Sequence, residues 1–435
     1  MRNQTKSAKQ DSYTNSPMIF FFGSVFSIVS VLTVDVNLNL YILNMFVLFI
    51  FSLIIKFTYL PALGLFIFCL SPVAYLSTLG IYQFLNPGNI VLFTYLLKNR
   101  NKLGPSVFLN VFLIFPIFLY LSFSSPNVIR SLGWTLTFFL VTAIFNLKLT
   151  ISSQEIVAFV RSTKLLILIL GTLAFLEWSF GWNPIRPFYN DYLIRQVIWS
   201  TDRITTTLGH PINNGLIFAT LLLILVVSSA HKSVHTNNSF YYALAFFAVV
   251  LSGSRAAFIS LVFAIIYLML AKHNVFHSYV NVKKFLKSLP IIIFLSLPIF
   301  PLLLIRNNSQ EGIKSINYRF KLIEHIRYDL PEIPTFGFGP GLGSTGFVER
   351  GFSTILENGV GQLIYGLGFS ISLTLMLIAF ALLVRNLYRR NPAFVLFFPV
   401  IVIFFSTNFI NDNFTSISFT GIIAIFYKLE LLNVS

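Results

Sequence analysis

Long apolar runs separated by short polar segments dominate this chain. Runs of this length approach the ~30 Å thickness of a bilayer's hydrocarbon core, so they predict membrane-spanning helices. We expect fourteen spans, and twelve fit equally well, because several runs are short and prolines interrupt the region 60–97. The runs fall at about 18–34, 38–55, 60–79, 81–97, 106–123, 128–147, 162–180, 211–230, 239–252, 256–271, 288–305, 356–384, 393–410 and 417–430.

The composition favours the same class of protein. Hydrophobic residues make up 56% of the 435 residues and charged residues only 10%, against about 25% charged in a soluble domain. The lone Cys69 excludes a disulfide scaffold. The chain is therefore expected to form one all-α polytopic membrane domain over residues 1–435, with about 12–14 transmembrane helices.

The net charge of +16 predicts how the chain is oriented. Basic residues form short clusters between the apolar runs rather than one polar module, which argues against a nucleic-acid partner. In membrane proteins, the cytoplasmic loops carry the excess of Lys and Arg. With both termini in the cytoplasm, the clusters at 98–102, 148–164, 272–287 and 385–390 all fall inside, and the outer basic residues are mostly arginines.

Two loops on the outer side of this topology are long, at 181–210 and 306–355. Long loops are uncommon in compact proteins unless they have a function, and binding and catalytic residues concentrate on loops. These two extracytoplasmic loops are therefore where we expect the chemistry.

The region 239–271 is expected to be a hairpin rather than a single span, because a single span would move the lysines at 272–287 outside. Its arms of 14 and 16 residues would be roughly 21–24 Å long, which is shorter than the bilayer. Arg255 would then lie at a turn below the outer membrane surface, where a charge needs a partner. This makes Arg255 a candidate anion ligand, with snorkelling to the interface as the alternative.

The end of the first long loop offers an arginine and a histidine beside a helix start. Arg203 is followed by several threonines and by His210, and Pro211 is a favoured first helical residue. An arginine near a helix N-terminus suits a phosphate. The alternatives are that Arg203 pairs with Asp202 at the interface and that His210 only caps or packs.

The second long loop contains an expected amphipathic helix over residues 316–330. Its apolar residues recur every three or four positions, which favours a helix lying on the outer surface. The polar face offers Arg319, Glu324, His325 and Arg327, either as ligands or as a solvated face with local ion pairs.

Two further features follow this helix along the chain. The glycine-rich run 337–343 could approach a phosphate through backbone N–H groups, although turns alone also explain it. Glu357 lies where the loop enters the next span, so it is a candidate general base or a charge stabilised by the helix dipole. The sequence has no nucleotide-binding glycine loop, no His-Glu-x-x-His and no paired Cys/His metal spacing, so we expect no metal and no cofactor.

These features together resemble the superfamily of O-antigen ligases and Wzy-type O-antigen polymerases. Four elements carry the resemblance. They are Arg203 leading to Gly209-His210-Pro211-Ile212-Asn213, the turn Leu251-Ser252-Gly253-Ser254-Arg255-Ala256-Ala257, the run Gly337–Gly343, and Glu357-Asn358 followed by Gln362-Leu363-Ile364-Tyr365-Gly366-Leu367-Gly368.

The resemblance implies metal-independent glycosyl transfer from undecaprenyl-pyrophosphate-linked glycans at the outer face of the bacterial cytoplasmic membrane. It assigns Arg203 and Arg255 to the pyrophosphate, and we add Arg319, Arg327 and His210 as substrate-binding candidates. Family ligases typically carry His-Asn at the end of the large loop, where this chain has Glu357. This departure favours the polymerase, with Glu357 as the first candidate base and His325 as the second.

The expected partners are membrane lipids, the lipid-linked glycans and a chain-length regulator. An O-antigen ligase, which transfers finished glycan to lipid A-core, is the alternative within the family. A lipid-linked oligosaccharide transporter or flippase is the alternative from a different class. A transporter would place ionisable residues near mid-membrane on several helices, whereas here nearly all charges lie at span ends or in the two outer loops.

Overall fold

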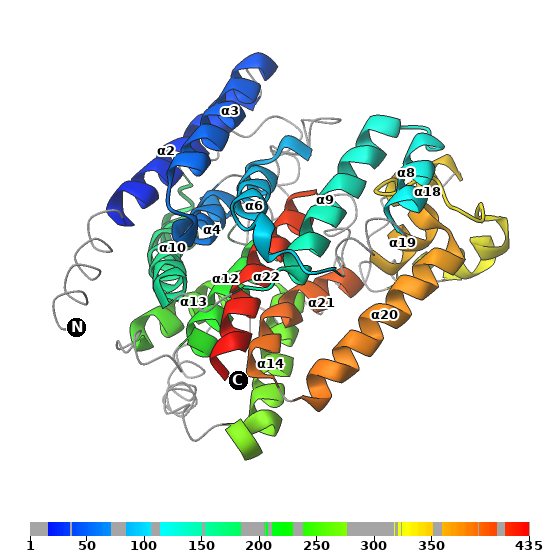
Figure 1. The fold of residues 1–435 in the computed structure, drawn as a ribbon. Coiled ribbons are helices and arrows are strands. Elements are labelled where there is room, and N and C mark those ends of the chain that lie inside the picture. Colours follow the sequence, from blue (N-terminus) through cyan, green and yellow to red (C-terminus); the bar gives the residue numbers. More distant parts are fainter. Residues whose placement is uncertain are drawn as a thin grey trace.

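The structure, a computed structural model, is a bundle of helices (Figure 1). Among the residues that it describes, the regular secondary structure is helical, apart from an isolated antiparallel bridge between Leu103 and Leu147. The described residues are 16–34, 37–70, 84–105, 114–149, 153–183, 204, 206–207, 211–228, 238–275, 317, 321–322, 324–350, 359–389, 391–406 and 414–434.

The α-helices of the first half are α2 (Ser16–Val34), α3 (Leu38–Ile54), α4 (Leu60–Leu70), α6 (Pro87–Lys98), α8 (Phe115–Phe123), α9 (Val128–Asn146), α10 (Ser153–Phe180) and α12 (Pro211–Ser228). Those of the second half are α13 (Ser239–Leu251), α14 (Arg255–Val275), α18 (Gly343–Glu349), α19 (Gly359–Leu367), α20 (Phe369–Tyr388), α21 (Phe398–Ser406) and α22 (Phe414–Val434). Short 3₁₀ segments are η1 (Phe57–Tyr59), η3 (Arg100–Lys102), η8 (Leu330–Glu332) and η9 (Pro392–Phe397).

Asparagine caps fix where several helices begin. The side chains of Asn37, Asn86 and Asn127 each accept a hydrogen bond from a backbone N–H in the first turn of α3, α6 and α9. Asparagine is among the best N-cap residues because its side-chain oxygen satisfies a donor that the helix leaves unpaired. In α6 the cap is followed by Pro87 at the first helical position, which needs no N–H partner.

Three helices are long and apolar enough to cross a membrane, judged by length and composition: Val128–Asn146, Gln154–Phe180 and Phe369–Tyr388. Shorter apolar helical stretches are Leu38–Ile54, Phe57–Leu70, Ile212–Ser228, Ser239–Leu251, Arg255–Leu268, Pro392–Val402 and Ile417–Leu429, and each overlaps a run that predicted a span. Helix α20 lies along one edge of the molecule (Figure 1), and only 6% of its apolar 18-residue stretch is buried inside the protein.

The predicted single span 356–384 is wrong in one respect, because the helix is broken at Gly368. This residue has φ +77°, a conformation that disfavours residues with a side chain. A Cβ on Gly368 would lie 1.9 Å from the carbonyl oxygen of Thr335. The chain therefore forms α19, turns at Gly368 to admit the backbone of the second loop, and continues as α20 to Tyr388.

The predicted hairpin at 239–271 is present as α13 and α14, joined at residues 252–254. Its second arm is longer than expected, because α14 has 21 residues and so reaches about 31 Å. Only α13, which has 13 residues, is therefore as short as the predicted arms that would place Arg255 below the outer surface. Arg255 is the first residue of α14, and its side chain is exposed.

Basic segments that the topology assigns to the cytoplasm lie together at one end of the bundle. The Lys98 ammonium donates to the Ile55 carbonyl, and the Lys148 N–H donates to the Lys102 carbonyl at 2.8 Å. The Lys428 ammonium also lies here, because it donates to the Leu147 carbonyl, and the charges of Arg385 and Arg389 interact with the nearby Tyr427 hydroxyl. We call this the basic end. Its residues are Lys56, Lys98, Arg100, Lys102, Lys148, Arg385, Arg389 and Lys428.

The described parts of both long loops lie at the other end of the helices. Helix α9 runs about 28 Å from the turn before Val128 to Asn146 at the basic end. Gly339 of the second loop contacts Ser125 in that turn, and Thr207 of the first loop bonds the Cys69 carbonyl near the far end of α4. The bundle therefore separates the basic end from the two loops.

Candidate functional site

The structure describes three of the seven residues that the sequence proposed as a site. Arg255 begins α14, and His325 and Arg327 lie exposed on the helical residues 324–329. The other four, Arg203, His210, Arg319 and Glu357, lie outside the described residues, so their predicted roles stay predictions.

Thr206, near the end of the first loop, is held from three directions. Its N–H donates to Glu177 Oε2 at 2.8 Å, its hydroxyl donates to Asn214 Oδ1 at 2.7 Å, and its carbonyl accepts from Asn183 Nδ2 at 3.0 Å. Ile204, the residue that follows Arg203, is 1% exposed, and its carbonyl accepts from Asn214. The loop is thus fixed to α10 and α12 directly after Arg203.

The backbone of Thr206 has φ +44°, the only positive φ among the described non-glycine residues. For a β-branched residue this left-handed conformation is an outlier that persists only where surrounding contacts impose it. The three hydrogen bonds that Thr206 makes with Glu177, Asn183 and Asn214 supply these contacts. None of the three was a sequence candidate, and no local motif marks them, because they reach Thr206 from 29, 23 and 8 residues away.

Gly215 brings the helix after the first loop against the turn that bears Arg255. A Cβ on Gly215 would lie 2.4 Å from Ser252 Oγ and 2.7 Å from Ser254 Cβ. Only glycine therefore permits α12 and this turn to approach so closely. The helix that follows Gly209–Asn213 is thus in direct contact with the turn at residues 252–254, about forty residues later in the sequence.

The turn before α14 is ordered by its own serines. The Ser252 hydroxyl donates to the Val249 carbonyl at 2.6 Å and accepts from the Ser254 N–H at 3.3 Å. Ser254 in turn caps α14 by accepting from the Ala257 N–H at 3.3 Å. Arg255 therefore projects from the first residue of a capped helix, where the helix dipole is positive. A guanidinium and a positive helix end together favour an anion.

The described part of the amphipathic segment has the predicted division into two faces. Leu322 is buried, and Ile326 and Leu330 pack with it, whereas the polar side chains are exposed. The apolar face packs against Phe347 of α18 and Ile364 of α19. The expectation of a helix resting on a membrane surface is thus corrected in part, because the protein itself covers the apolar face.

The glycine run packs against α19, and its first N–H groups are already used. Phe338 N–H donates to the Tyr365 carbonyl and Gly339 N–H to the Gly366 carbonyl, each at 2.8 Å. Gly337 N–H donates to the Pro334 carbonyl, also at 2.8 Å. These three groups cannot cradle a phosphate in this state, so the alternative of a close-packed turn describes this part of the run better.

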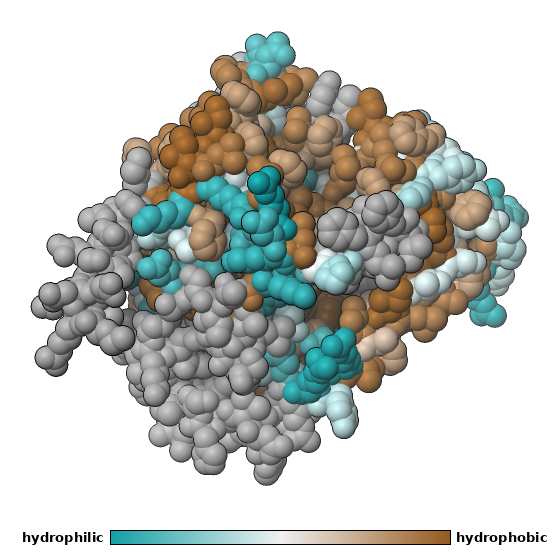
Figure 2. Space-filling view, viewed as in Figure 1, coloured by the Kyte–Doolittle hydropathy of each residue, from teal (hydrophilic) through white to brown (hydrophobic). Residues whose placement is uncertain are grey.

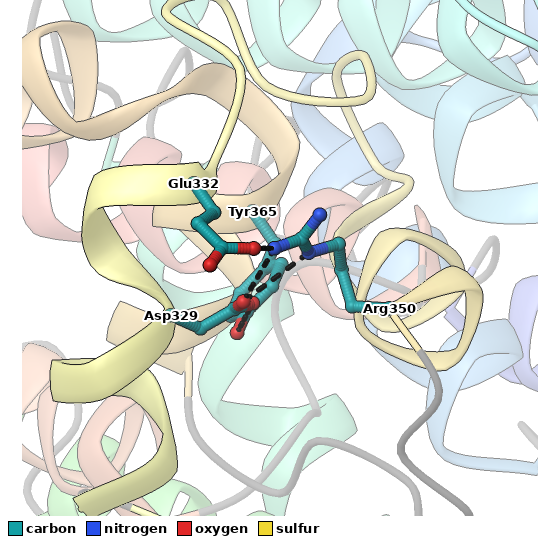
Figure 3. A network of polar contacts seen from close by, with 4 residues as sticks. All are labelled: Asp329, Glu332, Arg350 and Tyr365. Carbon is teal, nitrogen blue, oxygen red and sulfur yellow. Dashed lines mark hydrogen bonds and ion pairs between the residues drawn. The ribbon is translucent and has the colours of Figure 1, made fainter.

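A network of charged and polar side chains joins the second loop to α18 and α19 (Figure 3). Asp329 Oδ1 accepts from Arg350 Nη2 at 2.8 Å and from Nε at 3.2 Å, and Asp329 Oδ2 accepts from the Tyr365 hydroxyl at 2.5 Å. Arg350 also pairs with Glu332. We call these four residues the clasp. Sequence reasoning missed it because Asp329 and Arg350 are 21 residues apart and form no motif.

The clasp is electrostatically satisfied within itself. Burial alone would raise the pKa of Asp329, but the hydrogen bonds from Arg350 and Tyr365 and the charge of Arg350 outweigh burial and lower it. In formal charge, the two carboxylates of Asp329 and Glu332 more than balance the one guanidinium of Arg350. The clasp therefore holds the loop in place and does not attract an anion.

Within the part of the chain that the structure describes, no group of three or more His, Cys, Asp or Glu side chains comes together as a metal site would require. The described residues instead place Arg255 at the turn that packs against α12, and they place His325 and Arg327 on the loop that the clasp holds.

Comparison of the chain with protein-family models, with curated proteins and with solved structures finds no match.

Proposed function

We propose that this protein is a polytopic glycan polymerase of the bacterial cytoplasmic membrane. It joins undecaprenyl-pyrophosphate-linked oligosaccharide repeats at the outer face, where the two long loops lie. The proposal rests on the resemblance of four sequence elements to O-antigen ligases and polymerases and on how the described parts of these elements pack.

The observation that carries the proposal is the contact at Gly215. Residues 203–213 lead directly into α12, and Gly215 of α12 lies against the turn that ends in Arg255. Thr206 and Asn214 tie the loop to the same end of α12. Two arginines far apart in sequence are therefore carried by segments that pack together, as a shared diphosphate site requires.

The chemistry needs such a site. A hydroxyl oxygen of one lipid-linked repeat attacks the anomeric carbon of the other glycan, and the bond from that carbon to the diphosphate oxygen breaks. Undecaprenyl pyrophosphate leaves with the bonding electrons. Negative charge accumulates on this leaving group, so Arg203 and Arg255 would stabilise the transition state more than the ground state.

The proton of the attacking hydroxyl needs an acceptor, and two candidates belong to segments that pack on each other. Glu357 precedes α19 by two residues in the sequence, and His325 lies on the segment whose Ile326 packs against the apolar cluster that includes Ile364 of α19. The clasp adds the bond between Asp329 and Tyr365. We propose Glu357 as the base and His325 as the second candidate, with Arg319, Arg327 and His210 contacting substrate.

The membrane setting rests on the apolar helices and on the separation of charge. Three helices are long and apolar enough to cross a bilayer. The basic end would face the cytoplasm, in keeping with the excess of Lys and Arg on that side of membrane proteins. The exposed apolar surface of α20 would then face lipid or a lipid-linked substrate.

The test is the length of surface glycan chains in cells that carry Arg203→Ala or Arg255→Ala at normal protein levels. We expect long chains to collapse to single repeats, whereas Lys321→Ala, which removes an exposed charge from the second loop, should leave chain length unchanged. Wild-type chain lengths in both arginine variants would refute the anion site. Long chains that accumulate on the lipid carrier in a deletion strain, without transfer to lipid A-core, would show a ligase instead.

A further inference from the structure

The basic end combines concentrated positive charge with exposed apolar side chains. Figure 2 shows a hydrophilic area in the middle of this view, where Figure 1 places the end of α6, with hydrophobic surface above it. Its basic residues come from segments far apart in sequence, between Lys56 and Lys428. The proposed glycosyl transfer uses none of them.

Three segments converge at this end through defined contacts. The Lys98 ammonium binds the carbonyl of Ile55, and the Lys102 ammonium lies 5.3 Å from the centre of the Phe57 ring. Lys102 also accepts a backbone hydrogen bond from Lys148. These contacts bring the turn after α3, the end of α6 and the end of α9 together, so their charges act on one small area.

Little acidic charge balances the basic end among the side chains that the structure describes. A carboxylate beside these segments is Glu155, which is 2% exposed and accepts a hydrogen bond from the Tyr95 hydroxyl at 3.1 Å. Lys56, Arg100 and Lys148, by contrast, are exposed. A mobile anion is therefore attracted to this surface.

The apolar neighbours indicate that the anion belongs to an amphiphile. Ile54 at the end of α3 is 78% exposed, and Phe93 and Leu97 of α6 are 51% and 39% exposed. Phe93 and Leu97 are four residues apart and so share one face of α6, directly before Lys98. A soluble phosphate or a nucleic acid would leave these apolar side chains in water, whereas a lipid would cover them with an acyl chain.

We propose that the basic end is a binding site for an anionic phospholipid of the inner leaflet. The phosphodiester lies among Lys56, Arg100 and Lys148, and an acyl chain covers Ile54 and the apolar face of α6. Basic clusters between helices on the cytoplasmic side recognise anionic headgroups in this way. The site requires the membrane setting but not the proposed glycosyl transfer.

The experiment compares lipid binding to the intact, detergent-purified protein by native mass spectrometry. The probes are palmitoyl-oleoyl phosphatidylglycerol, the matching phosphatidylcholine and inorganic phosphate. The variant Arg100→Gln with Lys148→Gln removes two exposed charges whose side chains make no hydrogen bond or ion pair among the contacts that the structure describes, and Lys321→Gln removes an exposed charge from the opposite end as a control.

We expect the protein to retain phosphatidylglycerol over phosphatidylcholine. Each basic residue near a lipid surface contributes about 1 kcal/mol, so the loss of two should weaken phosphatidylglycerol binding roughly 30-fold at low salt, with no change in the control. Equal retention of the two lipids, or equal phosphatidylglycerol binding by the double variant and the Lys321→Gln control, would overturn the proposal. So would displacement of the lipid by millimolar inorganic phosphate, since the acyl chain would then contribute nothing.

Discussion

The contact at Gly215 leads to a prediction that separates stability from activity. In Gly215→Ala, the new methyl group would lie 2.4 Å from Ser252 Oγ, whereas ordinary contacts begin at 3.4 Å. The turn before Arg255 must therefore move away from α12 by about 1 Å. Overpacking of this kind costs about 1–3 kcal/mol, while replacing glycine by alanine within a helix returns about 1 kcal/mol.

The net loss of unfolding free energy is thus only about 0–2 kcal/mol, and the protein should stay folded in the membrane. Activity should respond far more strongly, because a displacement of about 1 Å at a site can cost about 100-fold in rate. The assay is the glycan chain-length distribution in cells, together with the thermal unfolding temperature of the purified protein.

Gly171→Ala is the matched control for this experiment. It makes the same substitution in α10, where the new methyl group would lie 2.6 Å from Leu244 Cγ, a side chain of α13. We expect a comparable shift in unfolding temperature with normal chain lengths. Normal chain lengths in Gly215→Ala would refute the claim that the approach of α12 to this turn sets the site. An equal loss in both variants would show that helix packing in general is responsible.

Three further predictions concern the clasp and the break before α20. Tyr365→Phe removes a hydrogen bond to the ionised Asp329 and should cost about 1.5–3 kcal/mol, measured as faster amide hydrogen exchange in residues 324–350. The pKa of Asp329 is lower in the folded state than in the unfolded state, so the stability that Asp329 contributes is present above the unfolded pKa and lost as pH falls through the folded pKa. In Asp329→Asn, the free energy of unfolding should therefore fall less steeply toward acid pH. An unchanged acid dependence would contradict this expectation. Gly368→Ala places a methyl group against the Thr335 carbonyl at a positive φ, so it should lower the unfolding temperature, whereas Gly181→Ala, also at a positive φ but with open space around it, should lower it less.

The sequence predicted much of the fold because apolar runs and their interruptions are local signals. Helices α9 and α12 begin within a residue of their expected starts, and the hairpin around residues 252–254 follows from keeping the lysines at 272–287 inside. The clusters around Lys98 and Lys148 share one end, as their common assignment to the cytoplasm requires.

What the sequence could not predict depends on contacts between distant residues. The break at Gly368 exists because Thr335, 33 residues earlier, approaches the backbone there. The clasp needs Asp329, Arg350 and Tyr365 to meet through the folding of the second loop. For the glycine run, the sequence allowed either a phosphate cradle or a close-packed turn, and only its hydrogen bonds to α19 distinguish the two.

The most direct test of the central claim is turnover by the purified protein in liposomes supplied with an undecaprenyl-pyrophosphate-linked repeat unit. We predict that products of two or more repeats form, that one undecaprenyl pyrophosphate is released for each new linkage, and that Arg255→Ala slows this reaction by about 100-fold or more. Absence of both products with the folded wild-type protein, or an undiminished rate in Arg255→Ala, would contradict the account.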